Sequence, residues 1–215
     1  MWQTAASPRL PAAGRPEALR PGLVLPPGLR VGLYGGSFDP AHAGHAHVAE
    51  TARRSLGLDR VVWLVSPQNP LKGWDASVSL ARRMAGARRQ ARGRDMIVSD
   101  IEARLGGGQA RYTIDTVRWF KTRFPGVRFV WIMGADNLAS FHLWRGWAAL
   151  MREVPIAVVS RPQIAIRSRF AAATRRFAGA RRPAAAARIL ADATPPAWIY
   201  IPAPFHAVSS TALRG

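Results

Sequence analysis

One stretch restricts the fold of this chain more than any other, the segment GGSFDPAHAGH that runs from Gly35 to His45. The residues before it, 30–34, form a short apolar run that predicts a buried strand, and residues 46–56 carry Ala, Val, Glu and Arg at helical spacing. The segment therefore predicts a strand, a tight glycine turn and a helix start. Unpaired N–H groups at a helix start favour an anion such as a phosphate, and the glycines at 35, 36 and 44 would let it approach the backbone.

The same segment carries two histidines, His42 and His45, at a spacing of three residues. On the first turn of a helix this spacing places both rings on one face. A glycine turn before a helix is common by itself, and a single histidine is more often structural. Because the two features coincide here, we expect a site that handles charge on a phosphate.

The rest of the chain alternates short apolar runs with helical patterns. With 215 residues and 48% hydrophobic content, one globular domain with a substantial core is expected. The alternation predicts an α/β fold, namely a single Rossmann-like domain with a parallel sheet of five to six strands, helices on both faces and a ligand cleft at the carboxyl ends of the strands. The expected strands are residues 30–34, 61–65, 96–100, 128–133, 155–159 and 197–201.

Two regions lack this pattern. Residues 1–29 contain prolines and arginines, which predicts a flexible N-terminal extension ahead of a domain over residues 30–215. Residues 163–194 are rich in Ala and Arg and predict one or two basic helices, broken near Gly179 and Pro183.

The composition narrows the classes of partner. The net charge of +19 favours acidic partners, and a protein that binds small polyanionic ligands also tolerates such a charge. Nucleic acid is unlikely, because the arginines are scattered and no run of basic residues exceeds two. No apolar run is long enough to span a membrane. The chain has no cysteine, which is compatible with a reducing cytoplasm, the expected location.

Single polar residues mark further candidate positions. Lys72 is one of two lysines in an arginine-rich chain and follows a proline-containing loop, which suits a point charge on a phosphate. Thr113 is a candidate N-cap for a helix that reaches about Phe124, while Asp115 suits its first turn. Asp136 follows an apolar strand and could accept hydrogen bonds from a ribose or cap the next helix. The helix expected over residues 77–92 should expose its arginines to solvent.

Several of these segments resemble one known family. The run GGSFDPxHxGH resembles the signature of the nucleotidyltransferase superfamily with a (His/Thr)-x-Gly-His motif, and within it the bacterial nicotinate-nucleotide adenylyltransferases. Other segments resemble the same family, namely PxxPLK ending at Lys72, YTIDT from Tyr112, GADN from Gly134, SRP from Ser160 and SSTALR from Ser209. The resemblance covers about residues 30–214 and leaves residues 163–194 unmatched.

The resemblance implies adenylyl transfer from ATP to nicotinate mononucleotide, which gives deamido-NAD and pyrophosphate in NAD biosynthesis, with Mg²⁺ carried by the ATP phosphates and no metal held by the protein. The implied catalytic residues are His45 and His42. The implied ATP-binding residues are Gly35, Gly36, Ser37, Phe38, His42, Gly44, His45, Gly134, Asp136, Arg161, Ser209, Ser210, Thr211 and Arg214. The implied residues for the mononucleotide are Lys72, Tyr112, Thr113, Asp136 and Trp144, with Trp144 stacked on the pyridine ring. Trp147 is assigned to the core.

Alternatives stay open. The chain could adenylylate nicotinamide mononucleotide or phosphopantetheine, although phosphopantetheine enzymes usually have Thr where His42 stands. It could also be a basic nucleic-acid-binding protein on the same fold, and a homo-oligomer is not excluded. Family members usually continue past Arg214 as a helical tail, so the phosphate cradle around Ser209 is expected to be loosely formed or the sequence to be truncated.

Overall fold

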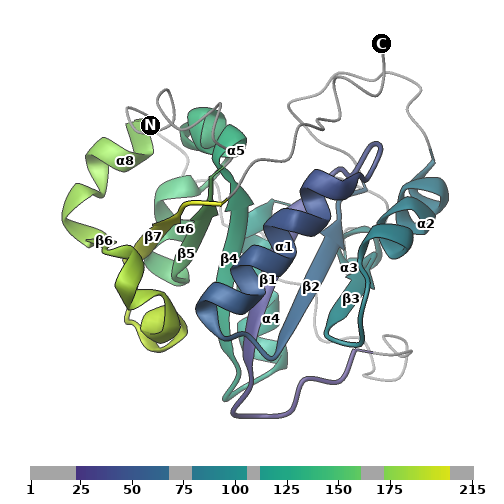
Figure 1. Ribbon diagram of the computed structural model, residues 1–215, viewed down its shortest axis with the longest axis horizontal. Coiled ribbons are helices and arrows are strands. Elements are labelled where there is room, and N and C mark those ends of the chain that lie inside the picture. Colours follow the sequence, from purple (N-terminus) through teal and green to yellow (C-terminus); the bar gives the residue numbers. More distant parts are fainter. Residues whose placement is uncertain (1–22, 68–78, 106–111, 161–171, 204–215) are drawn as a thin grey trace, which may run out of the picture.

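The computed structural model describes residues 23–67, 79–105, 112–160 and 172–203, which form one parallel sheet with helices around it (Figure 1). The strands of this sheet lie in the order β3-β2-β1-β4-β5-β7-β6, and all neighbouring pairs are parallel. Their bounds are β1 Arg30–Gly36, β2 Arg60–Val65, β3 Met96–Ser99, β4 Arg128–Gly134, β5 Ile156–Val159, β6 Arg181–Arg182 and β7 Trp198–Ile201. The α/β architecture with a parallel sheet is confirmed.

The described sheet has seven strands, so the expectation of five to six was wrong. The additional strand is β6, which pairs with β7 at the edge of the sheet. It lies in the Ala/Arg-rich region that was expected to be helical. Both of its residues, Arg181 and Arg182, are exposed, and two exposed arginines leave no apolar period that would reveal a strand. Around it, the same region forms α8 Ala172–Arg176 and the 3₁₀ helices η3 Ala178–Ala180 and η4 Ala184–Asp192.

Helices cover both faces of the sheet, as expected. One face packs against α1 Ala43–Leu56, α2 Leu80–Gln90 and η4, with α1 and α2 in front of the sheet in Figure 1. The other face packs against the remaining helices, which are α3 Ile101–Leu105, α4 Thr113–Arg123, α5 Ala135–Ser140, η2 Phe141–Leu143, α6 Trp147–Glu153 and α8. None of the described helices is long and apolar enough to cross a membrane.

The central strands are buried on both sides. In β4, Trp131 and Met133 join one hydrophobic cluster while Val130 and Ile132 join the other, and all four are at most 1% exposed. Alternate residues of a strand point to opposite faces, so a strand that is covered twice needs an uninterrupted apolar run. This is why residues 128–133 predicted a buried strand from the sequence alone.

The chain order creates one topological switch point. From β1 the chain moves to β2 and β3 on one side, and then it returns to β4 and β5 on the other. The carboxyl ends of β1 and β4 are therefore adjacent, while the connections that leave them run to opposite sides. Open α/β sheets bind ligands at this reversal, and here it is bordered by Gly36 and Gly134.

The segment before β1 also belongs to the packed domain. Leu25 is 5% exposed within the hydrophobic cluster that contains α4. The N–H of Gly28 donates to the carbonyl of Gly126 at 2.9 Å. The described packing thus begins several residues before the boundary expected at residue 29, while residues 1–22 lie outside the described part of the chain.

Candidate active site

The glycine turn at the end of β1 is held by packing beneath it. The carbonyl of Gly36 accepts the N–H of Ser66 at 3.0 Å, which ties the turn to the end of β2. A Cβ atom on Gly35 would collide with the indole of Trp131, and one on Gly36 would come within 3.1 Å of the Phe38 ring. Aromatic rings are thus one reason for both glycines. That an anion approaches the same backbone stays a prediction.

Phe38 closes the turn in an unusual backbone conformation. Its φ is +48°, in the left-handed region that side chains other than glycine rarely adopt. Its ring is 1% exposed and lies 5.4 Å from Tyr34, 5.0 Å from Trp63 and 5.1 Å from His45, measured between ring centroids. The side chain of Phe38 therefore belongs to the core, and only its backbone can face a ligand of the kind that the resemblance implies.

The two histidines cap α1 reciprocally. His42 is the N-cap residue, and its Nδ1 accepts the backbone N–H of Gly44 at 3.0 Å. In return, the backbone N–H of His42 donates to Nδ1 of His45 at 3.3 Å. This is a capping box with histidine at both positions, where Ser or Thr and Glu are more usual. The expectation that His42 and His45 share one face at the helix start is confirmed, with their ring centroids 4.0 Å apart, although His42 is the N-cap and not a residue of the first turn.

The cap determines where each imidazole carries its proton. An Nδ1 that accepts a backbone N–H carries no hydrogen, so the neutral ring has its proton on Nε2. Both rings are therefore held as Nε2–H donors. His42 is 4% exposed, whereas His45 is only partly buried. The geometry thus makes His45 the more accessible of the two donors at the start of α1.

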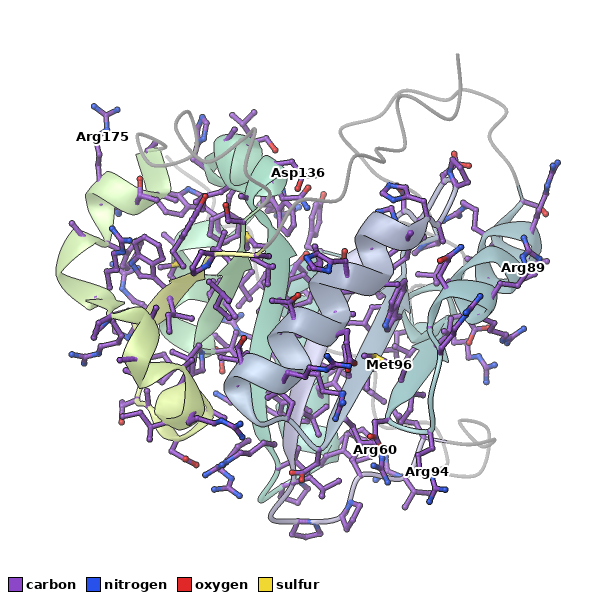
Figure 2. The ribbon with its side chains drawn as sticks, viewed as in Figure 1. Arg60, Arg89, Arg94, Met96, Asp136 and Arg175 are labelled. Atoms are coloured by element: carbon purple, nitrogen blue, oxygen red, sulfur yellow. The ribbon has the colours of Figure 1, made fainter. Side chains whose placement is uncertain are left out.

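Asp136 follows the neighbouring strand β4 and lies at the same end of the sheet as the glycine turn. It lies in the first turn of α5, directly after β4, and its side chain is exposed. Figure 2 shows it at the end of the sheet where α1 begins. No side-chain hydrogen bond caps α5, and the N-cap residue is Gly134, so Asp136 is not the cap. An acidic residue there is favourable to the helix dipole, and its contact with a ribose stays a prediction.

The start of α4 differs from the sequence expectation in one respect. Thr113 is the first helical residue and Tyr112 is the N-cap, without a side-chain capping bond, so Thr113 is not the cap. Because the backbone of Tyr112 is in the β region, the cap lies at this residue, one position earlier in the sequence than expected. Thr116 instead anchors this turn, because its hydroxyl donates to the buried carboxylate of Glu102 at 3.1 Å. Asp115 lies in the first turn, as expected.

Trp144 lies close to this helix start. Its ring packs edge-on against Trp131, with centroids 6.4 Å apart, and it is partly exposed. The guanidinium of the next residue, Arg145, lies 4.6 Å from the centroid of the Tyr112 ring. Tyr112, Thr113 and Trp144 therefore lie in one region, which is necessary if all three are to contact one mononucleotide. Trp147 packs against the hydrophobic cluster, which confirms it as a core residue.

Sequence reasoning missed Arg83. The arginines of α2 were expected to face solvent, and Arg82, Arg88 and Arg89 do, but Arg83 is 6% exposed. Burial lowers the pKa of its guanidinium, and the nearby charge of Asp39 partly opposes this effect. The sequence did contain a signal for this burial. Residues 80, 83, 84 and 87 are spaced as one face of a helix, and all of them except Arg83 are apolar.

Six predicted residues lie outside the described part of the chain, namely Lys72, Arg161, Ser209, Ser210, Thr211 and Arg214. Among the residues that the structure does describe, no group of three His, Cys, Asp or Glu side chains could hold a metal ion.

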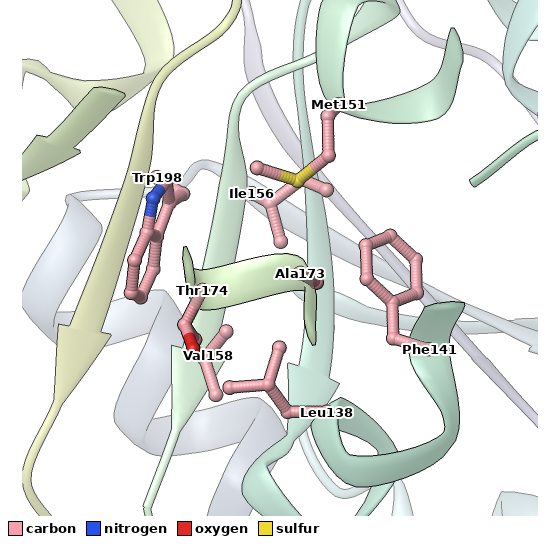
Figure 3. Close-up of a pocket in the computed structure, with 8 residues that line it drawn as sticks. All are labelled: Leu138, Phe141, Met151, Ile156, Val158, Ala173, Thr174 and Trp198. Atoms are coloured by element: carbon pink, nitrogen blue, oxygen red, sulfur yellow. The ribbon is translucent and has the colours of Figure 1, made fainter. Parts of the chain in front are cut away.

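A pocket under α8 is not a candidate for a nucleotide. It is lined by Leu138, Phe141, Met151 and Trp198 among others, and Thr174 is the one hydroxyl-bearing residue in its wall (Figure 3). Phosphates need charged or N–H donors, which these side chains do not supply in number. The glycine turn and its neighbours remain the candidate active site.

A glycine turn and a capped helix start at the switch point of a parallel sheet are typical of a nucleotide-binding α/β domain, and comparison with known proteins agrees. Residues 33–215 match the cytidylyltransferase-like family. In fold, the chain is similar to a nicotinic acid mononucleotide adenylyltransferase of Plasmodium falciparum complexed with NaAD, with a TM-score of 0.62 at 15% identity, covering 86% of this chain and 82% of the other. The same protein complexed with APC gives a TM-score of 0.61. This likeness supports the Rossmann-like fold.

Sequence relatives define the family more closely. A probable nicotinate-nucleotide adenylyltransferase of Caulobacter sp. strain K31 is 64% identical over 187 residues, which cover 87% of this chain and 97% of the relative. One from Cereibacter sphaeroides strain ATCC 17023 is 48% identical, covering 86% and 95%. The chain belongs to the nicotinate-nucleotide adenylyltransferase family, and the resemblance seen in its motifs is confirmed.

Proposed function

We propose that this chain transfers the adenylyl group of ATP to nicotinate mononucleotide, giving deamido-NAD and pyrophosphate in NAD biosynthesis. The observation that carries the proposal is the pair of histidines that caps α1 after β1, at the same end of the sheet as Asp136, which follows the neighbouring strand β4. The names of the close relatives specify the same reaction.

The chemistry needs charge stabilisation more than a base. An oxygen of the mononucleotide's 5′-phosphate forms a bond to the α-phosphorus of ATP, and the bond from that phosphorus to the bridging oxygen breaks to release pyrophosphate. The attacking phosphate is already an anion, so positioning and neutralisation should provide the rate enhancement. His45 would donate its Nε2–H to the transferring phosphate. His42 would donate to the ATP phosphates and, through the cap, hold His45 in place.

The remaining phosphates need further cations. Arg161 and the cradle of Ser209, Ser210, Thr211 and Arg214 match ATP-binding motifs of the family, and we propose that they bind the triphosphate. Mg²⁺ would arrive on the ATP, held mainly by phosphate oxygens and water. Lys72 would hold the phosphate of the mononucleotide. We propose a cytoplasmic location, with which the absence of cysteine is compatible.

The start of α4 should favour nicotinate over nicotinamide. N–H groups at a helix start are donors only, so they suit both oxygens of a carboxylate, whereas an amide would turn its own NH₂ toward one of them. An unpaired buried donor costs about 1–3 kcal/mol. The kcat/KM of the enzyme should therefore favour nicotinate mononucleotide by roughly tenfold to several hundredfold. Trp144 would stack on the pyridine ring of either substrate.

The test is pyrophosphate release from ATP with nicotinate mononucleotide, nicotinamide mononucleotide or phosphopantetheine as the acceptor. The proposal requires the highest kcat/KM with nicotinate mononucleotide. Equal use of the two pyridine nucleotides would refute the proposed pocket, and a preference for phosphopantetheine would refute the assignment of substrate. Retention on DNA together with no pyrophosphate release from any acceptor would favour the nucleic-acid-binding alternative.

A further inference from the structure

The buried guanidinium of Arg83 donates hydrogen bonds to the two segments that follow β1 and β2. Its Nη1 donates to the carbonyls of Ser37 at 2.8 Å and Ser66 at 2.7 Å, and its Nη2 donates to the carbonyl of Pro67 at 2.8 Å. Ser37 follows the glycine turn of β1, and Ser66 and Pro67 follow β2. Hydrogen bonds from a charged donor are roughly twice as strong as neutral ones, so one side chain of α2 fastens both strand ends together.

These bonds also orient the peptide that enters the turn. The carbonyl of Ser37 and the N–H of Phe38 belong to one planar unit and point in opposite directions if it is trans. With the carbonyl held toward Arg83, the N–H of Phe38 points away from α2. A carbonyl that turned the other way would place its negative end where a donor is needed. Arg83 thus restricts the orientation of the peptide that precedes the left-handed residue Phe38.

We propose that Arg83 is a positioning residue for the reaction, in that its guanidinium holds the Ser37–Phe38 peptide and the end of β2 in the arrangement that binds the phosphates of ATP. This inference rests on the proposed adenylyl transfer. The planar guanidinium can reach three carbonyls from a fixed fork, whereas the ammonium of lysine is a compact point charge on a flexible stem. The identity of the residue as arginine should therefore matter, and not only its charge.

The neighbouring Arg82 gives a matched control. It lies on the same helix, carries the same charge and is exposed. The variants to compare are Arg83→Met, which keeps an unbranched stem but removes the guanidinium, Arg83→Lys, which keeps the charge, and Arg82→Met. For each, we would measure kcat and KM for ATP by pyrophosphate release, the Kd of a non-hydrolysable ATP analogue by calorimetry, and the Tm.

Arg83→Met should lower kcat/KM for ATP by about a hundredfold, the size expected when catalytic groups are displaced by about an ångström. The KM for ATP and the Kd of the analogue should both rise, Arg83→Lys should fall in between, and Arg82→Met should match wild type. A purely structural role would lower the Tm and the active fraction without changing KM or Kd. Unchanged KM and Kd in folded Arg83→Met would thus overturn the inference.

If Arg83→Met does not fold, Arg83→Lys decides alone, and wild-type kcat, KM and Kd in this variant would overturn the inference. A failure of the proposed function is recognised separately, because wild type would then release no pyrophosphate. In that case the calorimetry still tests the positioning role, since weaker binding of the analogue by the Arg83 variants than by wild type would support it and equal binding would refute it.

Discussion

Replacement of Phe38 by alanine and by glycine separates the contribution of its ring from that of its backbone. The ring is 1% exposed among Tyr34, Trp63 and His45, and truncation of a buried phenylalanine to alanine costs about 3–5 kcal/mol of unfolding free energy. Both variants lose the ring, but alanine must also adopt a φ near +48°. This costs an L-residue roughly 1–2 kcal/mol that glycine avoids.

The unfolded state opposes this gain, because the greater freedom of an unfolded glycine costs about 0.4–1 kcal/mol relative to alanine. The difference leaves Phe38→Gly more stable than Phe38→Ala by about 0.5–1 kcal/mol. Urea unfolding of both proteins, followed by far-ultraviolet circular dichroism, measures this difference. As a control, Ala81→Gly at the exposed second residue of α2 should show the usual order and destabilise by up to about 1 kcal/mol. If glycine were the less stable residue at position 38 as well, the left-handed turn would not be a constraint of the fold.

Two further variants test other contacts. Thr113→Pro should lower the kcat/KM preference for nicotinate over nicotinamide mononucleotide while the Tm stays nearly constant. The Tm should hold because proline is tolerated at the first helical position and Tyr112 already has the β-region backbone that a following proline needs. An unchanged preference would show that the N–H of Thr113 does not contact the substrate. Lys121 and Arg118 hold the pKa of Glu153 below its usual range, so the carboxylate stabilises the fold above its unfolded pKa and this contribution is lost as pH falls through the lower folded value. Glu153→Gln should then lower the free energy of unfolding, measured with urea, by under about 1 kcal/mol at pH 7. It should not lower it at pH values below both the folded and the unfolded pKa of Glu153. A loss of stability that did not depend on pH would contradict the ion pair.

The central strands and the glycine turn could be predicted from the sequence because their signals are local. The apolar runs of β1, β2 and β4 are continuous because each strand is covered on both faces, and such runs need no knowledge of distant residues. The histidine pair was equally readable, since a spacing of three residues on a first helical turn fixes a shared face.

What escaped prediction depends on long-range contacts. The strand β6 exists because its backbone meets β7, and its two exposed arginines carry no strand signal. Arg83 was assigned to solvent because arginine is usually exposed, yet the three carbonyls that bury it come from segments before α2 in the chain. The reciprocal cap was also missed, because His42 and His45 were considered only as ligands of a phosphate and not as hydrogen-bond partners of the backbone.

The most direct test of the account is the kcat of His45→Asn. The amide oxygen of asparagine can still accept the N–H of His42 and keep the cap on α1, but asparagine has no donor where Nε2 stands. If His45 donates to the transferring phosphate, kcat for adenylyl transfer should fall by the equivalent of about 2–4 kcal/mol, with a Tm close to that of wild type. A folded His45→Asn protein with the kcat of wild type would contradict the assignment of His45 as the catalytic donor.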